Sequence, residues 1–127
     1  MKILAHTDYQ SPAESGNGIL VLANDVNVLD VNLDGITQID LHFPAFTDGR
    51  AFTQAYLLRR RRKFAGDIRA TGDVLIDQLV QMYRTGFSTA VLREGVDQAD
   101  AQRQFERFSG FYQADAVNPT PHFVEHA

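Results

Sequence analysis

Four short apolar or alternating runs predict the strands of this protein, and longer amphipathic segments between them predict helices. The runs cover residues 19–22, 37–43, 67–71 and 89–92. The first is continuously apolar, as in a buried strand, whereas the second and third alternate between apolar and polar residues with the period of a strand. The intervening segments are long enough for the helical crossover that parallel strands require. The pattern therefore predicts an α/β domain with a parallel sheet.

Three helices are expected between and after these strands, over residues 49–63, 73–85 and 97–112. Thr47 or Asp48 before the first helix, and Asp73 before the second, stand where an N-terminal cap accepts hydrogen bonds from the first free N–H groups of a helix. Gly86 suits the left-handed position that commonly ends a helix. These signals place a helix after each of the last three predicted strands.

The segments outside these elements are expected to be irregular. Residues 26–36 have apolar residues at helical spacing, but their asparagines and β-branched residues favour one or two helical turns at most. Residues 1–17 end in a cluster of Ser, Pro, Gly and Asn and are interpreted as a loop-like lead-in. Residues 113–127 contain two prolines and no period, which indicates an extended or mobile tail. With no internal repeat, residues 1–127 are interpreted as a single α/β domain.

Polar residues on the second and third strands distinguish between two arrangements of the sheet. Gln38, Asp40 and His42 share one face of the second strand, and Arg69 and Thr71 share one face of the third. A doubly wound sheet is covered on both faces and has more continuously apolar strands. We therefore favour four consecutive parallel β/α units that form a half-barrel-like sheet, and the alternative is a flavodoxin-like doubly wound sheet.

The same polar positions lead to two further expectations. Asp40 and Arg69 should be near neighbours on one face of the sheet, because a charge buried alone is costly. Right-handed crossovers between sequential strands place all helices on one side of a sheet. The opposite face would then need a cover, for which a homodimer is our first expectation.

The composition excludes several classes of protein. The chain has 127 residues, 44% of them hydrophobic, and it contains no cysteine, which excludes disulfides and thiolate metal sites. No apolar run approaches the roughly 20 residues of a membrane helix, and the start of the chain does not resemble a secretory signal. We therefore expect a cytoplasmic protein. The formal net charge of −4 disfavours nucleic acid as a partner. Motifs for metals, dinucleotides and P-loop phosphates are absent from the sequence, so no metal and no cofactor are expected.

The basic run from Arg59 to Lys63 is the main departure from the acidic composition. Cations suit the C-terminal end of a helix, where they interact favourably with its dipole. Successive helical residues point about 100° apart, so the five side chains cannot form a single stripe. A solvated helix end is one interpretation, and a docking surface for an acidic partner protein or an anionic ligand is the other.

Two turns between a predicted strand and a predicted helix hold the candidate binding residues. In the first turn, TDGR, the start of a helix and an arginine could bind an oxyanion such as sulfate, phosphate or a carboxylate. In the second turn, ATGDV, a glycine allows close approach of a ligand to the backbone. The alternative is that both aspartates only cap their helices. The candidate ligand-binding residues are Asp48, Gly49, Arg50, Arg69 and Gly72.

Catalytic candidates lie at the carboxyl ends of the same strands, where α/β proteins usually bind their ligands. His42 suits general acid–base work, and Asp40 shares its face of the strand. Asp73 follows the third strand directly. A hydrogen-bonded structural role for His42 is the alternative, and the residues alone leave open whether the protein is an enzyme.

The motifs just described resemble those of a bacterial family, domain of unknown function 934. The segments that carry the resemblance are LANDV, IDLHFPAFTDGRAFTQAYLLR, GDIRATGDVLIDQL and TGFSTAVLR, which lie between Ile19 and Tyr112. Members of the family are commonly encoded beside assimilatory sulfite reductase. The resemblance implies a role in sulfate assimilation, accessory to sulfite reduction, and it supplies no catalytic residue.

Two hypotheses follow from the residues and the resemblance together. The first is a non-catalytic accessory protein that is a partner of the sulfite-reducing system, either as a homodimer or bound to a reductase subunit. The second is a small oxyanion- or nucleotide-binding enzyme that uses the carboxyl-end rim of the sheet. They differ in whether Arg50, Arg69 and His42 converge on one pocket or are held separately by partners within the chain.

Overall fold

The computed structural model of the protein describes residues 1–9, 18–45 and 47–115, with side chains described up to residue 107. Within these ranges the chain forms five strands: β1 (Lys2–Leu4), β2 (Ile19–Leu22), β3 (Gln38–Phe43), β4 (Asp67–Gly72) and β5 (Thr89–Val91). The α-helices are α2 (Arg50–Arg60), α3 (Leu79–Thr85) and α4 (Gln98–Asp115). Two short 3₁₀ turns are η1 (His6–Asp8) and η2 (Ile76–Gln78).

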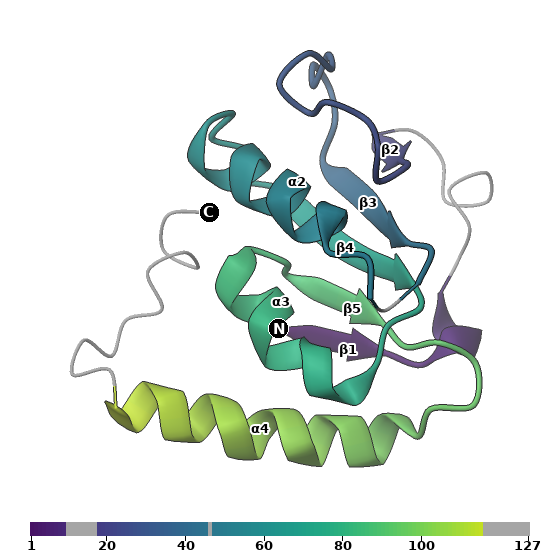
Figure 1. Cartoon of the computed structure of the whole chain (residues 1–127), viewed down its shortest axis with the longest axis vertical. Coiled ribbons are helices and arrows are strands. Elements are labelled where there is room, and N and C mark those ends of the chain that lie inside the picture. Colours follow the sequence, from purple (N-terminus) through teal and green to yellow (C-terminus); the bar gives the residue numbers. More distant parts are fainter. Residues whose placement is uncertain (10–17, 46, 116–127) are drawn as a thin grey trace.

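The strands form one open parallel sheet, so the predicted parallel α/β fold is confirmed. Their order is β1-β5-β4-β3-β2, and every neighbouring pair is parallel. Strands β2 to β5 are therefore neighbours in the order of the sequence, as expected for consecutive β/α units. Figure 1 shows α2 and α3 packed over one side of the sheet, with α4 beside α3. The other side carries no helix among the residues that the structure describes.

The sheet contains a fifth strand where the sequence analysis expected a loop. β1 lies at the sheet edge beside β5, with Ile3 opposite Ala90, so the loop-like interpretation of residues 1–17 is wrong for residues 2–4. A strand of three residues with a single buried member, Ile3, has too little alternation to be recognised from sequence. The backbone N–H of Leu92 donates to the carbonyl of Leu4 at 2.9 Å and extends the pairing beyond the strand. Residues 10–17 lie outside the described ranges.

Helix α2 ends earlier than expected, at Arg60 rather than at residue 63. Lys63 has a φ of 56°, in the left-handed region that stops a helix. The N–H of Phe64 then donates to the carbonyl of Leu58 at 2.9 Å, which closes the end of the helix. The predicted stop at Gly86 is confirmed, because its φ is 130° and its N–H donates to the Met82 carbonyl at 3.1 Å.

The second predicted helix begins later than residue 73. Asp73 does not cap it, because η2 has Leu75 and α3 has Gln78 at the N-cap position. The backbone N–H of Asp73 donates to the carbonyl of Phe43 at 2.8 Å and continues the pairing of β4 with β3. The chain then passes through η2 before α3 starts at Leu79. At the end of the described chain, α4 continues to Asp115. Residues 113–115 are therefore helical rather than extended, and the rest of the predicted tail lies outside the described ranges.

The helical turns expected within residues 26–36 are not formed. This segment links β2 to β3 through non-helical turns. Asparagine side chains bond to the backbone beside isolated turns: Asn27 Oδ1 accepts from the N–H of Leu29 at 3.1 Å, and Asn32 Oδ1 accepts from the N–H of Asp34 at 3.0 Å. The N–H of Asp30 donates to the Asn27 carbonyl at 3.1 Å in one of these turns. Asparagine favours such local bonds over the hydrogen bonds of a helix. The low helix propensity of this segment therefore outweighed the helical spacing of its apolar residues.

The core lies between the sheet and the helices, and aromatic rings fill its centre. Ile39, Leu41 and Phe43 are fully buried on the helix side of β3, which confirms the predicted phase of this strand. The Phe43 ring lies 5.1 Å from that of Phe52 and 5.8 Å from that of Phe87, between ring centroids. A second pair, Tyr83 on α3 and Phe105 on α4, joins the two helices at 5.5 Å. In the described part of the chain, no helix is long and apolar enough to cross a membrane.

Candidate functional site

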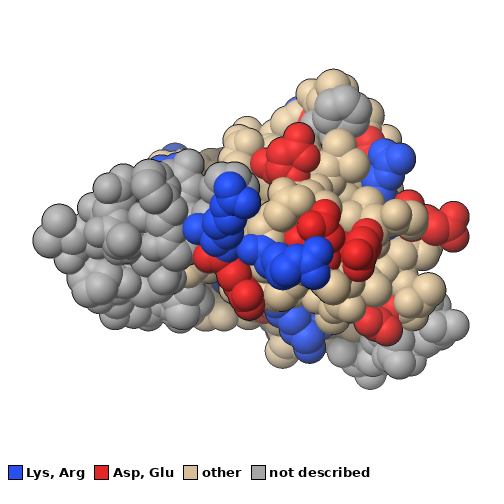
Figure 2. Space-filling view, turned by 90° about the horizontal axis from the view of Figure 1, so that it is seen from below, with Lys and Arg blue, Asp and Glu red and all other residues tan. Residues whose placement is uncertain are grey.

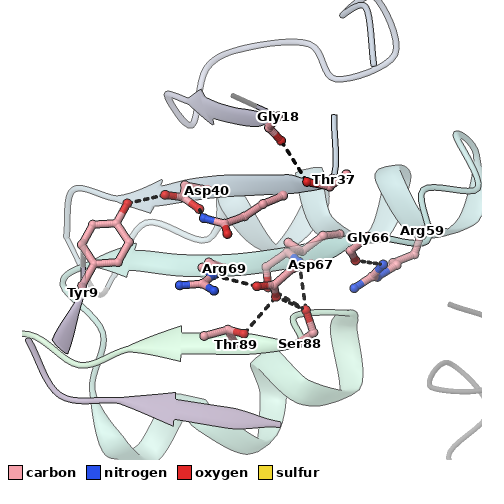
Figure 3. Close-up of polar contacts among 12 residues, drawn as sticks. Tyr9, Gly18, Thr37, Asp40, Arg59, Gly66, Asp67, Arg69, Ser88 and Thr89 are labelled. Atoms are coloured by element: carbon pink, nitrogen blue, oxygen red, sulfur yellow. Dashed lines mark hydrogen bonds and ion pairs between the residues drawn. The ribbon is translucent and has the colours of Figure 1, made fainter. Parts of the chain in front are cut away.

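The side of the sheet that carries no helix, called the open face here, holds a buried carboxylate. Asp40 of β3 is fully buried. It accepts hydrogen bonds from the hydroxyl of Tyr9 and, at 2.9 Å, from the side-chain amide of Gln38 (Figure 3). Burial raises the pKa of Tyr9 well above its ordinary value, and the Asp40 carboxylate raises it further. Tyr9 therefore stays protonated and donates to Asp40, which ties the segment after β1 to the middle of the sheet.

Arg69 of β4 lies directly opposite Asp40 in the strand register, as predicted. Its ion pair, however, is with Asp67 on its own strand, with Arg69 Nε 2.7 Å from Asp67 Oδ2. Burial alone would raise the pKa of Asp67, but hydrogen bonds from Ser88, Arg69 and Thr89 outweigh that effect and lower it. Figure 3 shows these groups converging on Asp67 near the start of β4. On the open face, the carboxylates of Asp40 and Asp67 therefore each accept hydrogen bonds from neighbouring side chains.

At the first strand-to-helix turn, the carboxylate of Asp48 occupies the start of α2. Its Oδ1 accepts from the backbone N–H of Arg50 at 3.1 Å, and its Oδ2 lies 2.8 Å from Arg50 Nη2. Asn24, which follows β2, donates to the same carboxylate at 2.7 Å. The Arg50 side chain holds the pKa of Asp48 well below its usual range. Asp48 thus remains charged and occupies the position at which an external oxyanion was predicted.

At the second turn, Gly72 has a φ of 91° and lies against the end of β3. A Cβ atom at this position would stand 2.3 Å from the carbonyl oxygen of Phe43 and 2.7 Å from Cε1 of His42. Only glycine fits this position, and its lack of a side chain makes room for the His42 imidazole. Asp73, the next residue, forms an ion pair with Arg93 at 2.8 Å.

The structure thus brings some of the predicted residues together and separates others. Asp40 and Arg69 face each other, and His42 lies beside Gly72. Three arginines at or near the predicted site are each held by an aspartate: Arg50 by Asp48, Arg69 by Asp67 and Arg93 by Asp73. No group of three or more potential metal ligands occurs among the residues that the structure describes.

Sequence reasoning missed two members of the polar network. Tyr9 belongs to the segment interpreted as a lead-in loop, and its partner Asp40 lies 31 residues away. Nothing in the local sequence pointed to this contact. Asp67 could have been found, because it stands two residues before Arg69 in an alternating strand and therefore shares its face.

The basic run from Arg59 to Lys63 spans the end of α2 and the turn that follows it, and its side chains have two kinds of surroundings. Arg59 donates to the carbonyls of Gly86, Phe64 and Gly66 at 2.8–2.9 Å, and Arg62 donates to those of Val28 and Val31 at 2.7 and 2.9 Å. Arg60, Arg61 and Lys63 are exposed. Two of the five residues therefore join the end of α2 to neighbouring loops, and the other three face solvent.

The side of the molecule that carries α4 differs from the basic run, because it presents charges of both signs (Figure 2). Figure 2 views it from below Figure 1, and Lys and Arg side chains alternate there with Asp and Glu. On α4 itself, Arg103 and Asp100 form an ion pair at 3.2 Å. This side therefore presents interspersed charges of both signs rather than a surface of one sign.

These features define a class of protein, a one-sided parallel α/β domain with an ion-paired polar face. A family model described as "Bacterial protein of unknown function (DUF934)" matches residues 19–123, and the chain belongs to this family. No curated protein and no solved structure matches the chain. β1 and Tyr9 precede the matched residues, so the contact between Tyr9 and Asp40 joins an unmatched segment to a matched strand.

Proposed function

We propose that the protein is a non-catalytic accessory protein of sulfate assimilation, acting in the cytoplasm as a partner of the sulfite-reducing system. The family resemblance supports the pathway, since members are commonly encoded beside assimilatory sulfite reductase. The observation that carries the non-catalytic role is the pairing of Arg50, Arg69 and Arg93 with aspartates of the same chain. A site for a small oxyanion needs free donors that converge, and these guanidinium groups are already engaged.

The open face supports a role in binding another protein. Among the described residues the α-helices cover one side of the sheet, and the edge strand β2 exposes 52% of Val21 on the other. Parallel sheets are ordinarily covered on both faces. We therefore propose that the protein works as a homodimer, or bound to a reductase subunit, rather than as an isolated monomer.

A small oxyanion- or nucleotide-binding enzyme is the second candidate. It is favoured by the position of Arg50, whose side chain is 62% exposed in the first turn of an eleven-residue helix. His42 and Gly72 lie together at the same rim. An incoming oxyanion would have to displace the Asp48 carboxylate from the start of α2. Titration with sulfate, sulfite and adenosine phosphosulfate tests this candidate, which requires a rise in the thermal midpoint that Arg50→Gln abolishes.

The accessory role is tested by affinity purification of the tagged protein from its native host. Cells grown on sulfate are compared with cells grown on cysteine, and an unrelated tagged protein is the control. The proposal predicts that subunits of sulfite reductase are enriched from sulfate-grown cells. Absence of every sulfite-reducing component from the purified material, with the bait intact, would contradict it.

A further inference from the structure

The exposed residues of the basic run lie at the end of α2 and in the turn that follows it. Arg59 and Arg62 are three residues apart and turn toward the protein, where backbone carbonyls accept their hydrogen bonds. Arg60 at the end of α2, and Arg61 and Lys63 in the turn that follows it, are exposed. We call the exposed set the basic patch, and it consists of Tyr56, Arg60, Arg61 and Lys63.

The cations of the basic patch have no acidic partner among the described residues. The ion pairs in that part of the chain use Arg50, Arg69, Arg93 and Arg103. Structural demands do not account for the patch, because Arg59 and Arg62 already bind the neighbouring backbone carbonyls. Crowded like charges disfavour folding slightly. Cations that have no acidic partner among the described residues, on a protein with a net charge of −4, therefore indicate a surface that meets negative charge elsewhere.

The aromatic member gives the basic patch a second feature of a protein-binding surface. Tyr56 is 48% exposed, although it is a large side chain on an otherwise amphipathic helix. The guanidinium carbon of Arg60 lies 5.2 Å from the centroid of its ring, one helical turn further along. Tyrosine and arginine are the residue types that contribute most to protein interfaces. The stacking also orders the Arg60 side chain before any partner arrives, which lowers the entropy cost of binding.

We propose that the basic patch is a docking surface for an acidic segment of a partner protein. This inference rests on the proposed function in identifying that partner as a component of the sulfite-reducing system. Carboxylates of the partner would pair with Arg60, Arg61 and Lys63, and Tyr56 would supply apolar contact beside them.

An acidic protein fits the patch better than a nucleic acid does. Arg60 occupies a position over the Tyr56 ring where a base would stack. Arg62 holds the loop at Val28 and Val31 against the end of the helix, and the exposed Asp30 lies between those two residues in sequence. The short patch also opposes an extended phosphate backbone, which needs a longer basic track.

The test compares two triple variants that remove the same amount of positive charge. The patch variant is Arg60→Gln/Arg61→Gln/Lys63→Gln, and the control variant is Lys2→Gln/Arg103→Gln/Arg107→Gln. Affinity for purified assimilatory sulfite reductase is measured at low and at physiological ionic strength, and thermal midpoints verify that both variants fold. We expect the patch variant to bind about tenfold more weakly and with less dependence on salt. The control should stay within about twofold of the wild type.

Further measurements separate failure of this inference from failure of the proposed function. If the wild type binds the reductase and the patch variant binds equally well, the docking surface is elsewhere and the inference is wrong.

If the wild type does not bind the reductase at all, the proposed function fails, and a fluorescent glutamate-rich peptide tests the patch independently. The inference then requires that the wild type and the control bind the peptide, and that the patch variant does not. Binding of an RNA oligonucleotide in preference to the peptide would overturn it. A third variant, Arg60→Lys/Arg61→Lys, keeps the charge and should keep the binding.

Discussion

Replacing Arg69 with alanine tests the polar network of the open face most sharply. The Arg69 side chain is 21% exposed, and its Nε lies 2.7 Å from the Asp67 carboxylate. Removing one partner of a fully buried pair costs about 3–5 kcal/mol, whereas exposed pairs contribute about 0–1 kcal/mol. Arg69 lies between these limits, and Asp67 keeps hydroxyl donors from Ser88 and Thr89. We therefore expect Arg69→Ala to lower the free energy of unfolding by about 2 kcal/mol.

The assay is equilibrium unfolding in urea, with Arg50→Ala as the matched control. Arg50 also pairs with an aspartate two residues away in sequence, but its side chain is largely exposed, so its loss should change stability much less. A double-mutant cycle of Arg69→Ala with Asp67→Asn isolates the energy of the pair. An unchanged denaturant midpoint for Arg69→Ala, or a cycle without coupling, would refute the reasoning.

The pH dependence of this effect has a defined sign. The pKa of Asp67 is lowered in the folded protein, so the carboxylate stabilises the fold at pH values above its unfolded pKa of about 3.9. That stability is lost as the pH falls from there through the lowered folded pKa. The difference between the wild type and Arg69→Ala should therefore be complete at neutral pH and shrink below about pH 4.

Three further predictions concern other parts of the fold. Tyr9→Phe leaves the buried Asp40 carboxylate without one of its donors. The free energy of unfolding, measured in urea, should fall by about 1.5–3 kcal/mol, and an unchanged value would mean that the segment after β1 is not docked. Gly72→Ala places a Cβ 2.3 Å from the Phe43 carbonyl oxygen at a φ of 91°. It should reduce the thermal midpoint far more than Gly95→Ala, because no neighbouring atom lies within 4 Å of a Cβ at position 95. Sedimentation of the purified protein should show a homodimer at micromolar concentration, and a monomer throughout would contradict the proposed covering of the open face.

The parts of the fold that the sequence predicted correctly have a signal within their own residues, such as the apolar run of β2, the alternation of β3 or the glycine after α3. Ile39, Leu41 and Phe43 alternate with polar residues over the whole of β3, so both the strand and its buried face could be inferred. The glycine stop after α3 was equally clear, because a positive φ is required at that position. Where local preference and tertiary packing agree, a single sequence is sufficient to predict the element.

The parts that were missed depend on contacts between distant residues. β1 is defined by its pairing with β5 rather than by its own three residues. Arg69 pairs with Asp67 although Asp40 lies opposite it, because Tyr9 and Gln38 already supply donors to Asp40. The sequence indicates that Asp40, Asp67 and Arg69 share one face of the sheet. It does not indicate where Tyr9 lies, and the hydrogen bond from Tyr9 to Asp40 decides which aspartate pairs with Arg69.

Direct binding of the purified protein to purified assimilatory sulfite reductase tests the central claim most directly. The two components are mixed at micromolar concentrations and sedimented together, with each component alone as the reference. The accessory role predicts that the two components form a faster-sedimenting complex of fixed stoichiometry. Formation of this complex should not require sulfate or sulfite. Separate sedimentation of the two components at every concentration, together with a sulfate-dependent rise in thermal midpoint that Arg50→Gln abolishes, would contradict the accessory role and favour the oxyanion-binding enzyme.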